Sequence, residues 1–132
     1  MPSKESTHRI VDAMNVVGSR PDGWWRDRAG AVERLVGQLE AWAESSGERV
    51  TVVLEKQPTR PIEAGRVEVA WASSPGRDAA DDEIVRRLPE WVAAGKVVVV
   101  TSDRELAERA KATGATVEPA SGFRRQLDAD SV

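Results

Sequence analysis

Short runs rich in Val, Ile and Leu alternate along this chain with longer stretches in which apolar residues recur every three or four positions. The short runs are typical of strands buried on both faces of a sheet, and the longer spacing is typical of amphipathic helices. The pattern predicts strands at residues 8–17, 50–54, 67–71, 96–101 and 115–117. It predicts helices at residues 26–45, 79–94 and 102–113, and a last helical turn at 121–127.

Proline and glycine separate these elements and mark the connections between them. Residues 18–23 and 73–77 are predicted loops, and Pro58 and Pro61 prevent regular strand pairing just after the second strand. Pro89 predicts a kink or a restart within the second helix. The order strand-helix-strand-strand-helix-strand-helix-strand predicts an α/β fold, in which helices cover both faces of a mostly parallel sheet of about five strands.

Length and composition limit the domain organisation. A chain of 132 residues with 40% hydrophobic and 31% charged residues is typical of one globular domain. We expect a disordered lead-in at residues 1–7, one domain over residues 8–127 and a frayed tail at residues 128–132. No apolar run approaches the ~20 residues of a membrane-spanning helix, so no membrane association is expected.

Scarce residue types exclude several kinds of site. The chain has no Cys, which excludes disulfides, zinc ribbons and thiol nucleophiles and favours a cytoplasmic location. Residues 1–7 lack the apolar segment of a secretory signal. The single histidine, His8, excludes a histidine-rich metal site and leaves a serine triad with only one candidate base. Carboxylate chemistry with hard cations remains.

Acidic and amide residues accompany three of the predicted elements. In sequence order they are Asp12 and Asn15, then Asp78, Asp81 and Asp82, then Ser102 and Asp103. The carboxyl ends of strands in an open parallel sheet lie along one rim, where ligands bind, so we expect these clusters to converge. Carboxylates that lie together repel one another and need a cation to remain ionised. The pattern therefore predicts a site for one or two Mg²⁺ or Mn²⁺ ions.

Structural explanations remain open for most of these residues. An acid in the first turn stabilises a helix by ~0.3–1 kcal/mol through the helix dipole, and this applies to Asp81, Asp82 and Asp103. Ser102 is expected to cap the following helix, with Glu105 as its capping-box partner. Asn15 could hold a turn. Asp12 is the hardest to explain structurally, because apolar residues surround it and a buried carboxylate without a partner is unfavourable.

The net charge of −3 does not by itself indicate nucleic-acid binding, but the placement of some basic and aromatic residues does suit RNA. Most basic residues are Arg, whose planar guanidinium suits phosphate, and Arg77 and Arg104 flank the acidic clusters. Trp24 and Trp25 beside Arg26 could stack on unpaired bases. The alternative is that one or both tryptophans pack against the core beneath the first helix.

Three segments together resemble a known family. They are residues 11–16 (VDAMNV), 79–84 (AADDEI) and 99–106 (VVTSDREL), followed by Gly-Ala at 114–115. In this order they resemble the YacP-like NYN domains, within the PIN-like nucleases, over roughly residues 9–127. The resemblance implies a three-layer α/β/α Rossmann-like sandwich and a metal-dependent ribonuclease. The implied Mg²⁺ or Mn²⁺ ligands are Asp12, Asp81 and Asp103, with Asn15 and Ser102 in support and Asp78 and Asp82 as further candidates.

The chain departs from the family pattern after the second strand. Relatives often end that strand in an aromatic residue and an Asp, whereas this chain has Leu54, Glu55 and Lys56, and residues 57–65 are poorly matched. The leading hypothesis is an endoribonuclease that acts on single-stranded or flexible RNA, with a homodimer as a further expectation. The alternative is an RNA-binding module without catalysis. A phosphatase with Asp12 as nucleophile is disfavoured, because Met14 stands where a second Asp is needed.

Overall fold

A five-stranded parallel sheet forms the centre of the molecule in a computed structural model that describes residues 7–130. The strand order is β3-β2-β1-β4-β5, and every neighbouring pair is parallel. The strands are β1 (Thr7–Asp12), β2 (Arg49–Leu54), β3 (Glu68–Trp71), β4 (Lys96–Val100) and β5 (Thr116–Glu118). The predicted α/β class and the five-stranded parallel sheet are therefore confirmed.

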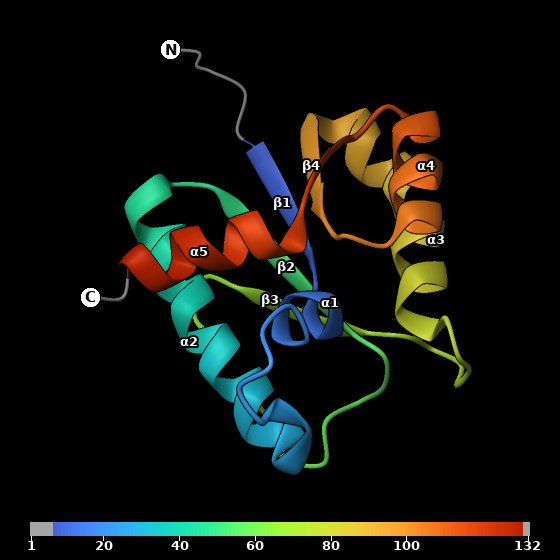
Figure 1. The fold of residues 1–132 in the computed structure, drawn as a ribbon. Helices are drawn as coiled ribbons and strands as arrows, with labels where there is room; N and C mark the ends of the chain where they lie inside the picture. Colours follow the sequence, from blue (N-terminus) through green and yellow to red (C-terminus); the bar gives the residue numbers. More distant parts are fainter. Residues whose placement is uncertain (1–6, 131–132) are drawn as a thin grey trace.

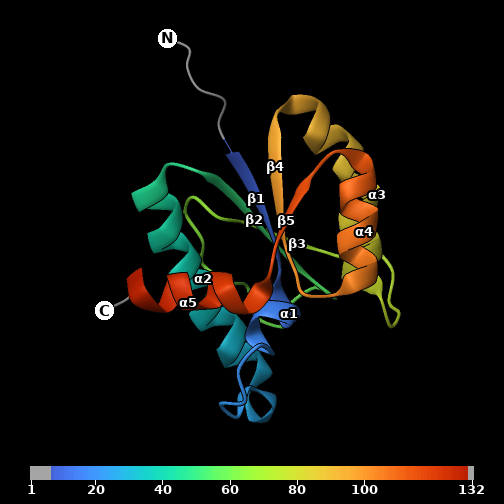
Figure 2. The same cartoon turned by 45° about the horizontal axis from the view of Figure 1, so that its top comes forward.

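Helices cover both faces of this sheet. They are α1 (Ala13–Val17), α2 (Arg28–Ser46), α3 (Ala79–Ala94), α4 (Arg104–Thr113) and α5 (Ala120–Asp130), with a short 3₁₀ helix, η1 (Trp24–Arg26), before α2. Figure 1 and Figure 2 show α1, α2 and α5 on one face, and α3 and α4 on the other. The result is the expected three-layer sandwich. No helix within residues 7–130 is long and apolar enough to span a membrane.

The alternation of side chains along β1 divides the core into two clusters. Val11 packs with α2 and α5, whereas Ile10 packs with α3 and α4. Because successive side chains of a strand point to opposite faces, Asp12 lies on the same face as Ile10. The first site residue is therefore directed toward α3 and α4.

The first predicted strand is too long. β1 ends at Asp12 instead of residue 17, and α1 begins at Ala13, so Asn15 lies on a helix. Ala13, Val16 and Val17 are buried on the α2 side of the sheet, and their burial stabilises a helical turn here. A five-residue helix is too short to show a helical period, so its apolar residues are indistinguishable from a continuing strand.

Several other boundaries differ from the prediction. The helix expected at 26–45 is divided into η1 and α2, and the Asp27 carboxylate caps α2 by accepting the N–H of Gly30 at 3.0 Å. α3 runs through Pro89 without a restart. The expected tail is helical as far as Asp130, because Asp128 pairs with Arg20 and holds α5 in place. Thr7 belongs to β1, and the predictions for residues 1–6, 131 and 132 lie outside the described residues.

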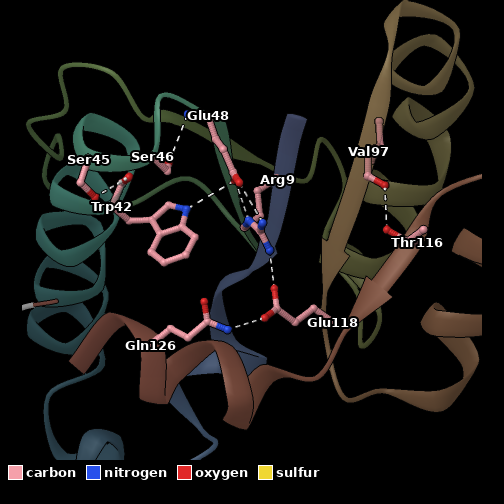
Figure 3. Close-up of polar contacts among 9 residues, drawn as sticks. All are labelled: Arg9, Trp42, Ser45, Ser46, Glu48, Val97, Thr116, Glu118 and Gln126. Atoms are coloured by element: carbon pink, nitrogen blue, oxygen red, sulfur yellow. Dashed lines mark hydrogen bonds and ion pairs between the residues drawn. The ribbon is translucent and has the colours of Figure 1, made fainter. Parts of the chain in front are cut away.

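A charged cluster closes the α2 and α5 side of the sheet. Arg9 on β1 pairs with Glu48 at 2.7 Å and with Glu118 at the end of β5 (Figure 3). Its guanidinium carbon lies 5.4 Å from the Trp42 ring centroid and 5.3 Å from that of Phe123. These contacts join two strands and two helices around one cation.

Candidate functional site

The strand order reverses beside β1. The chain leaves β1 toward β2 and β3 on one side, and α3 then carries it across to β4 on the other side of β1. In open parallel sheets, the crevice at the carboxyl ends of such strands is the usual place for a ligand. Asp12 ends β1, and residues 101–103 follow β4. The fold therefore directs both segments to this crevice.

Asp12 is a buried carboxylate at this position, with 5% of its surface exposed. Burial raises its pKa to about 6, and repulsion from Asp103 and Glu55 adds to the rise. The Thr101 hydroxyl, which donates to Oδ2 at 3.1 Å, and the backbone of Asn15 oppose it. No Arg or Lys among residues 7–130 forms an ion pair with Asp12. The site thus contains a buried acid whose charge no basic side chain balances.

Thr101 connects Asp12 to Asp103, a role that the sequence analysis missed. Its hydroxyl donates to Asp12 and accepts the backbone N–H of Asp103 at 3.1 Å. The signal in the sequence was weak: Thr101 is a hydroxyl residue at the end of an otherwise all-Val run, on the same face as Val97 and Val99. Only the neighbouring strand reveals which carboxylate this hydroxyl binds.

Asn15 and Ser102 fix the segment that follows β4. The Asn15 Oδ1 atom accepts the N–H of Ser102 at 2.7 Å, which joins α1 to this segment. The Ser102 hydroxyl accepts the N–H of Ala120 at 2.9 Å, at the start of α5. Asp103 caps α4, because its Oδ1 accepts the N–H of Leu106 at 2.9 Å. The predicted capping box of Ser102 and Glu105 is therefore wrong, since Ser102 is engaged by α5.

Asp81 continues the buried stripe of α3. It lies in the first turn, three residues before Ile84 and seven before Leu88, both of which are buried against the sheet. Burial raises its pKa to about 7, and repulsion from Asp12, Asp103 and its two acidic neighbours adds to the rise. Asp81 is therefore close enough to Asp12, at the end of β1, and to Asp103, the N-cap of α4, for their charges to act on its pKa.

Asp78 and Asp82 are exposed and lie at the outside of the acidic group. Asp78 precedes α3 but makes no capping hydrogen bond through its side chain. The Asp82 side chain is 67% exposed, and its Oδ1 lies 3.4 Å from a guanidinium nitrogen of Arg109. Both raise the pKa of Asp81 by repulsion, but neither continues the buried stripe. The structure therefore distinguishes Asp81, which continues the buried stripe, from Asp78 and Asp82, which are exposed.

The donor set fits a hard divalent cation by its chemistry. Its members are carboxylate oxygens, and repulsion from neighbouring carboxylates adds to the raised pKa values of Asp12 and Asp81. A bound cation relieves such repulsion. Within residues 7–130, however, no three His, Cys, Asp or Glu side chains already stand as a preformed metal-binding group. The carboxylates gather at one rim without being arranged as a finished coordination shell.

The basic and aromatic residues singled out in the sequence differ in their exposure and partners. Arg77 and Arg104 are exposed, and neither forms an ion pair with another described residue. Trp25 is 54% exposed, and Arg26 lies 6.0 Å from its ring centroid. Trp24 is half-buried against the core near α2. One tryptophan therefore has the exposure that stacking on a base requires, and the other is part of the core.

Glu55 follows β2, at the position where the sequence resemblance led us to expect an Asp. Its side chain is partly exposed and lies 3.3 Å from Arg28, and its charge contributes to the raised pKa of Asp12. Glu55 is therefore near the acidic group, but it has a basic partner that Asp12 lacks.

Comparisons with known proteins identify a family and similar folds. Residues 9–131 match the family model of the YacP-like NYN domain. Two crystal structures of Rae1 (YacP) from Bacillus subtilis are similar at 22% identity: the W164L mutant has a TM-score of 0.77 and covers 95% of this chain and 77% of its own. The other has a TM-score of 0.75, with coverages of 93% and 74%. No curated protein matches significantly.

At this identity the two crystal structures support the fold, whereas the family match spans nearly the whole chain. The match includes the ends of β1 and β4 and the start of α3, where the acidic residues gather. The chain therefore belongs to the YacP-like NYN domain family, one of the PIN-like ribonuclease families.

Proposed function

We propose that this protein is a metal-dependent endoribonuclease that hydrolyses phosphodiester bonds in single-stranded or flexible RNA. The observation that carries the proposal is the group formed by Asp12, Asp81 and Asp103. Repulsion within this group adds to the raised pKa values of Asp12 and Asp81, and none of the three acids forms an ion pair with a basic residue among residues 7–130. Strongly perturbed carboxylates in a crevice are typical of catalytic and metal-binding sites. Family membership supports a nuclease in general terms.

Asp12, Asp81 and Asp103 would hold Mg²⁺ or Mn²⁺, with Asp78 and Asp82 as outer candidates. The chemistry that such a cation supplies is activation of a water nucleophile and stabilisation of the departing oxygen. Thr101 orients the Asp12 carboxylate through its hydroxyl. Asn15 and Ser102 keep the segment after β4 against α1, which maintains the spacing of the acids.

RNA would approach over the basic and aromatic residues of the same rim. Arg77 and Arg104 would contact phosphates, because bidentate guanidinium contacts offset the repulsion between RNA and the acids. Trp25 and Arg26 would stack on an unpaired base. A cytoplasmic location and a homodimer stay predictions.

Cleavage of a mixed RNA pool in Mn²⁺ tests the proposal. We expect initial rates at least about 100-fold lower for Asp12→Asn and Asp81→Asn, because each removes a charge on which cation binding depends. Glu108→Gln is the matched control, since Glu108 is exposed on α4 beyond the acidic group. Circular dichroism checks that each variant is folded. Equal rates in all four proteins would contradict the proposal.

A binding module without catalysis is the second candidate. The observation in its favour is that no three acids among the described residues form a preformed metal site. This candidate predicts that the wild type retains RNA on a filter without cleaving it, and that Asp12→Asn binds equally well.

A further inference from the structure

A cavity of about 280 Å³ opens between α2 and the segment that follows β2. Figure 1 shows this segment, in green, passing α1 and the N-terminal end of α2. Apolar side chains form most of its wall, and they are those of Met14, Ala29, Val32, Leu54, Pro58 and Ile62. The cavity adjoins the end of β1, because Met14 follows Asp12 by two residues and Asp12 is paired in register with Val53, which precedes Leu54 and Glu55 at the cavity wall.

Polar contacts hold the walls of the cavity in place. The Glu40 carboxylate on α2 accepts the N–H groups of residues 65–67 at 2.6, 2.9 and 3.1 Å. Arg60 pairs with Glu33 on α2 at 2.8 Å, which ties the middle of the same segment to the helix. The Arg28–Glu55 pair connects the beginning of the same segment to α2. The cavity is therefore built into the fold, which lowers the ordering cost of binding a ligand.

The mouth of the cavity is basic. Arg28, Lys56 and Arg60 lie there, and the two arginines are balanced by Glu55 and Glu33. Lys56 is exposed and has no ion-pair partner among residues 7–130. An apolar interior with one unbalanced cation at its edge suits a planar heterocycle attached to a phosphate. The volume is near the lower end of the ~300–1,000 Å³ of small-molecule pockets, which suits one base.

We propose that this cavity, here named the base pocket, receives one unpaired nucleobase next to the scissile phosphate, while Lys56 contacts the adjoining phosphate. The inference rests on the proposed function, since it places the RNA relative to Asp12. Arg28 extends the base pocket toward η1, because its guanidinium lies 5.6 Å from the ring centroid of Trp24, which in turn contacts Trp25. RNA can thus pass from the exposed Trp25 to the base pocket and then to the acids.

The base pocket explains a preference for flexible RNA in physical terms. A base enters it only after leaving its stack and its pair, and extrusion from a duplex costs a few kcal/mol. A single strand avoids most of that cost. We therefore expect the same sequence to be bound more weakly as a duplex than as a single strand.

Fluorescence anisotropy with an Asp12→Asn protein, which keeps the RNA intact, tests the base pocket directly. Ala29→Phe places a ring at the mouth from an exposed position on α2, and Ala41→Phe is the matched control, exposed on the same helix away from the cavity. We expect Ala29→Phe to weaken binding of a single-stranded oligonucleotide about tenfold, as loss of one stacked base does. Ala41→Phe should change affinity less than about twofold.

Abasic RNA supplies a test that needs no change in the pocket. An oligonucleotide with abasic residues should bind about tenfold more weakly than the intact one, and Ala29→Phe should then cause no further loss, because both changes empty the same pocket. Lys56→Ala should weaken both oligonucleotides equally, because it removes a phosphate contact. Unchanged affinity for Ala29→Phe, or additive losses with abasic RNA, would overturn the inference.

Failure of the inference is distinguishable from failure of the nuclease proposal. If the wild type never cleaves RNA but Ala29→Phe weakens binding, the base pocket is supported and the nuclease proposal is contradicted. If the wild type cleaves RNA and Ala29→Phe binds and cleaves as Ala41→Phe does, the base pocket is contradicted and the nuclease proposal stands.

Discussion

Arg9 and Asp12 are charged residues three positions apart on β1, and their surroundings are opposite. The Arg9 side chain is 12% exposed, lies between Glu48 and Glu118, and is covered by two aromatic rings. Asp12 is 5% exposed and finds a hydroxyl from Thr101 but no basic side chain among the described residues. The strand directs them to opposite faces, so each has a separate set of neighbours.

The difference separates structural charge from functional charge. A buried ion whose charge is balanced contributes to a defined packing, and removing its partner is costly. A buried acid that stays unbalanced lowers the stability of the protein and persists where a ligand compensates it. Arg9 therefore belongs to the architecture, whereas Asp12 belongs to the proposed site, which a cation would complete.

The largest expected effect comes from Arg9→Met. The substitution leaves Glu48 and Glu118 without their cation. Because all three side chains are largely but not fully buried, the loss of unfolding free energy should approach the ~3–5 kcal/mol that breaking a fully buried pair costs. Urea denaturation measures it. Arg49→Met is the control, because Arg49 is 56% exposed and its pair with Glu68, at 3.6 Å, is worth less than about 1 kcal/mol. Similar losses in both variants would show that Arg9 is not specially placed.

Addition of Mn²⁺ should raise the stability of the wild type but not that of Asp12→Asn. A ligand that binds only the folded protein stabilises it by about 2.7 kcal/mol at 100 times its dissociation constant. Thermal denaturation over a series of Mn²⁺ concentrations measures the effect, and removal of the metal with EDTA should reverse it. Equal stabilisation of both proteins would place the metal elsewhere.

Without metal, Asp12→Asn should be more stable than the wild type at neutral pH. The pKa of Asp12 is raised from 3.8 to about 6 in the folded protein, chiefly by burial. Each pKa unit is worth about 1.4 kcal/mol, so the gain is on the order of 3 kcal/mol. A loss of stability in urea denaturation at pH 8 would show that the carboxylate itself holds the fold together.

The raised pKa of Asp12 also determines how the stability difference between Asp12→Asn and the wild type depends on pH. Below the unfolded pKa of 3.8, the carboxyl group is protonated in both folded and unfolded protein, and it costs nothing. As the pH rises from 3.8 to the folded pKa of about 6, the unfolded carboxyl group ionises while the folded one stays protonated, so the wild type loses stability that the variant keeps. His8, whose burial lowers its pKa to about 4, acts in the opposite direction but is common to both proteins. The difference should therefore grow between pH 4 and pH 6 and then level off.

The smallest expected effect comes from Asp82→Asn. Its side chain is exposed, faces Arg109 and does not continue the buried stripe of α3. We expect less than about a tenfold change in the rate of RNA cleavage, well below the effect of Asp81→Asn. The comparison of the two variants in one assay decides which first-turn acid serves the site. A larger loss for Asp82→Asn would reverse the assignment.

The sequence alone predicted the layer architecture. The Val-rich run before Thr101 indicates a buried strand, and the helical spacing of apolar residues before Gly47 indicates a helix with one apolar face. These patterns are local, so they identify elements and their order. Asp12 and the acidic clusters at residues 78–82 and 102–103 also stood out, because they lie within or beside apolar runs.

Only the tertiary structure decided which partner each polar group meets. Ser102 had the spacing of a helix cap, yet α5 lies close enough to take its hydroxyl, which leaves the cap to Asp103. Tertiary contacts also decided where β1 ends, which carboxylate Thr101 binds, and which of Asp81 and Asp82 continues the buried stripe. Each depends on a contact between segments far apart in the chain, and the periodicity of one segment carries no information about the other.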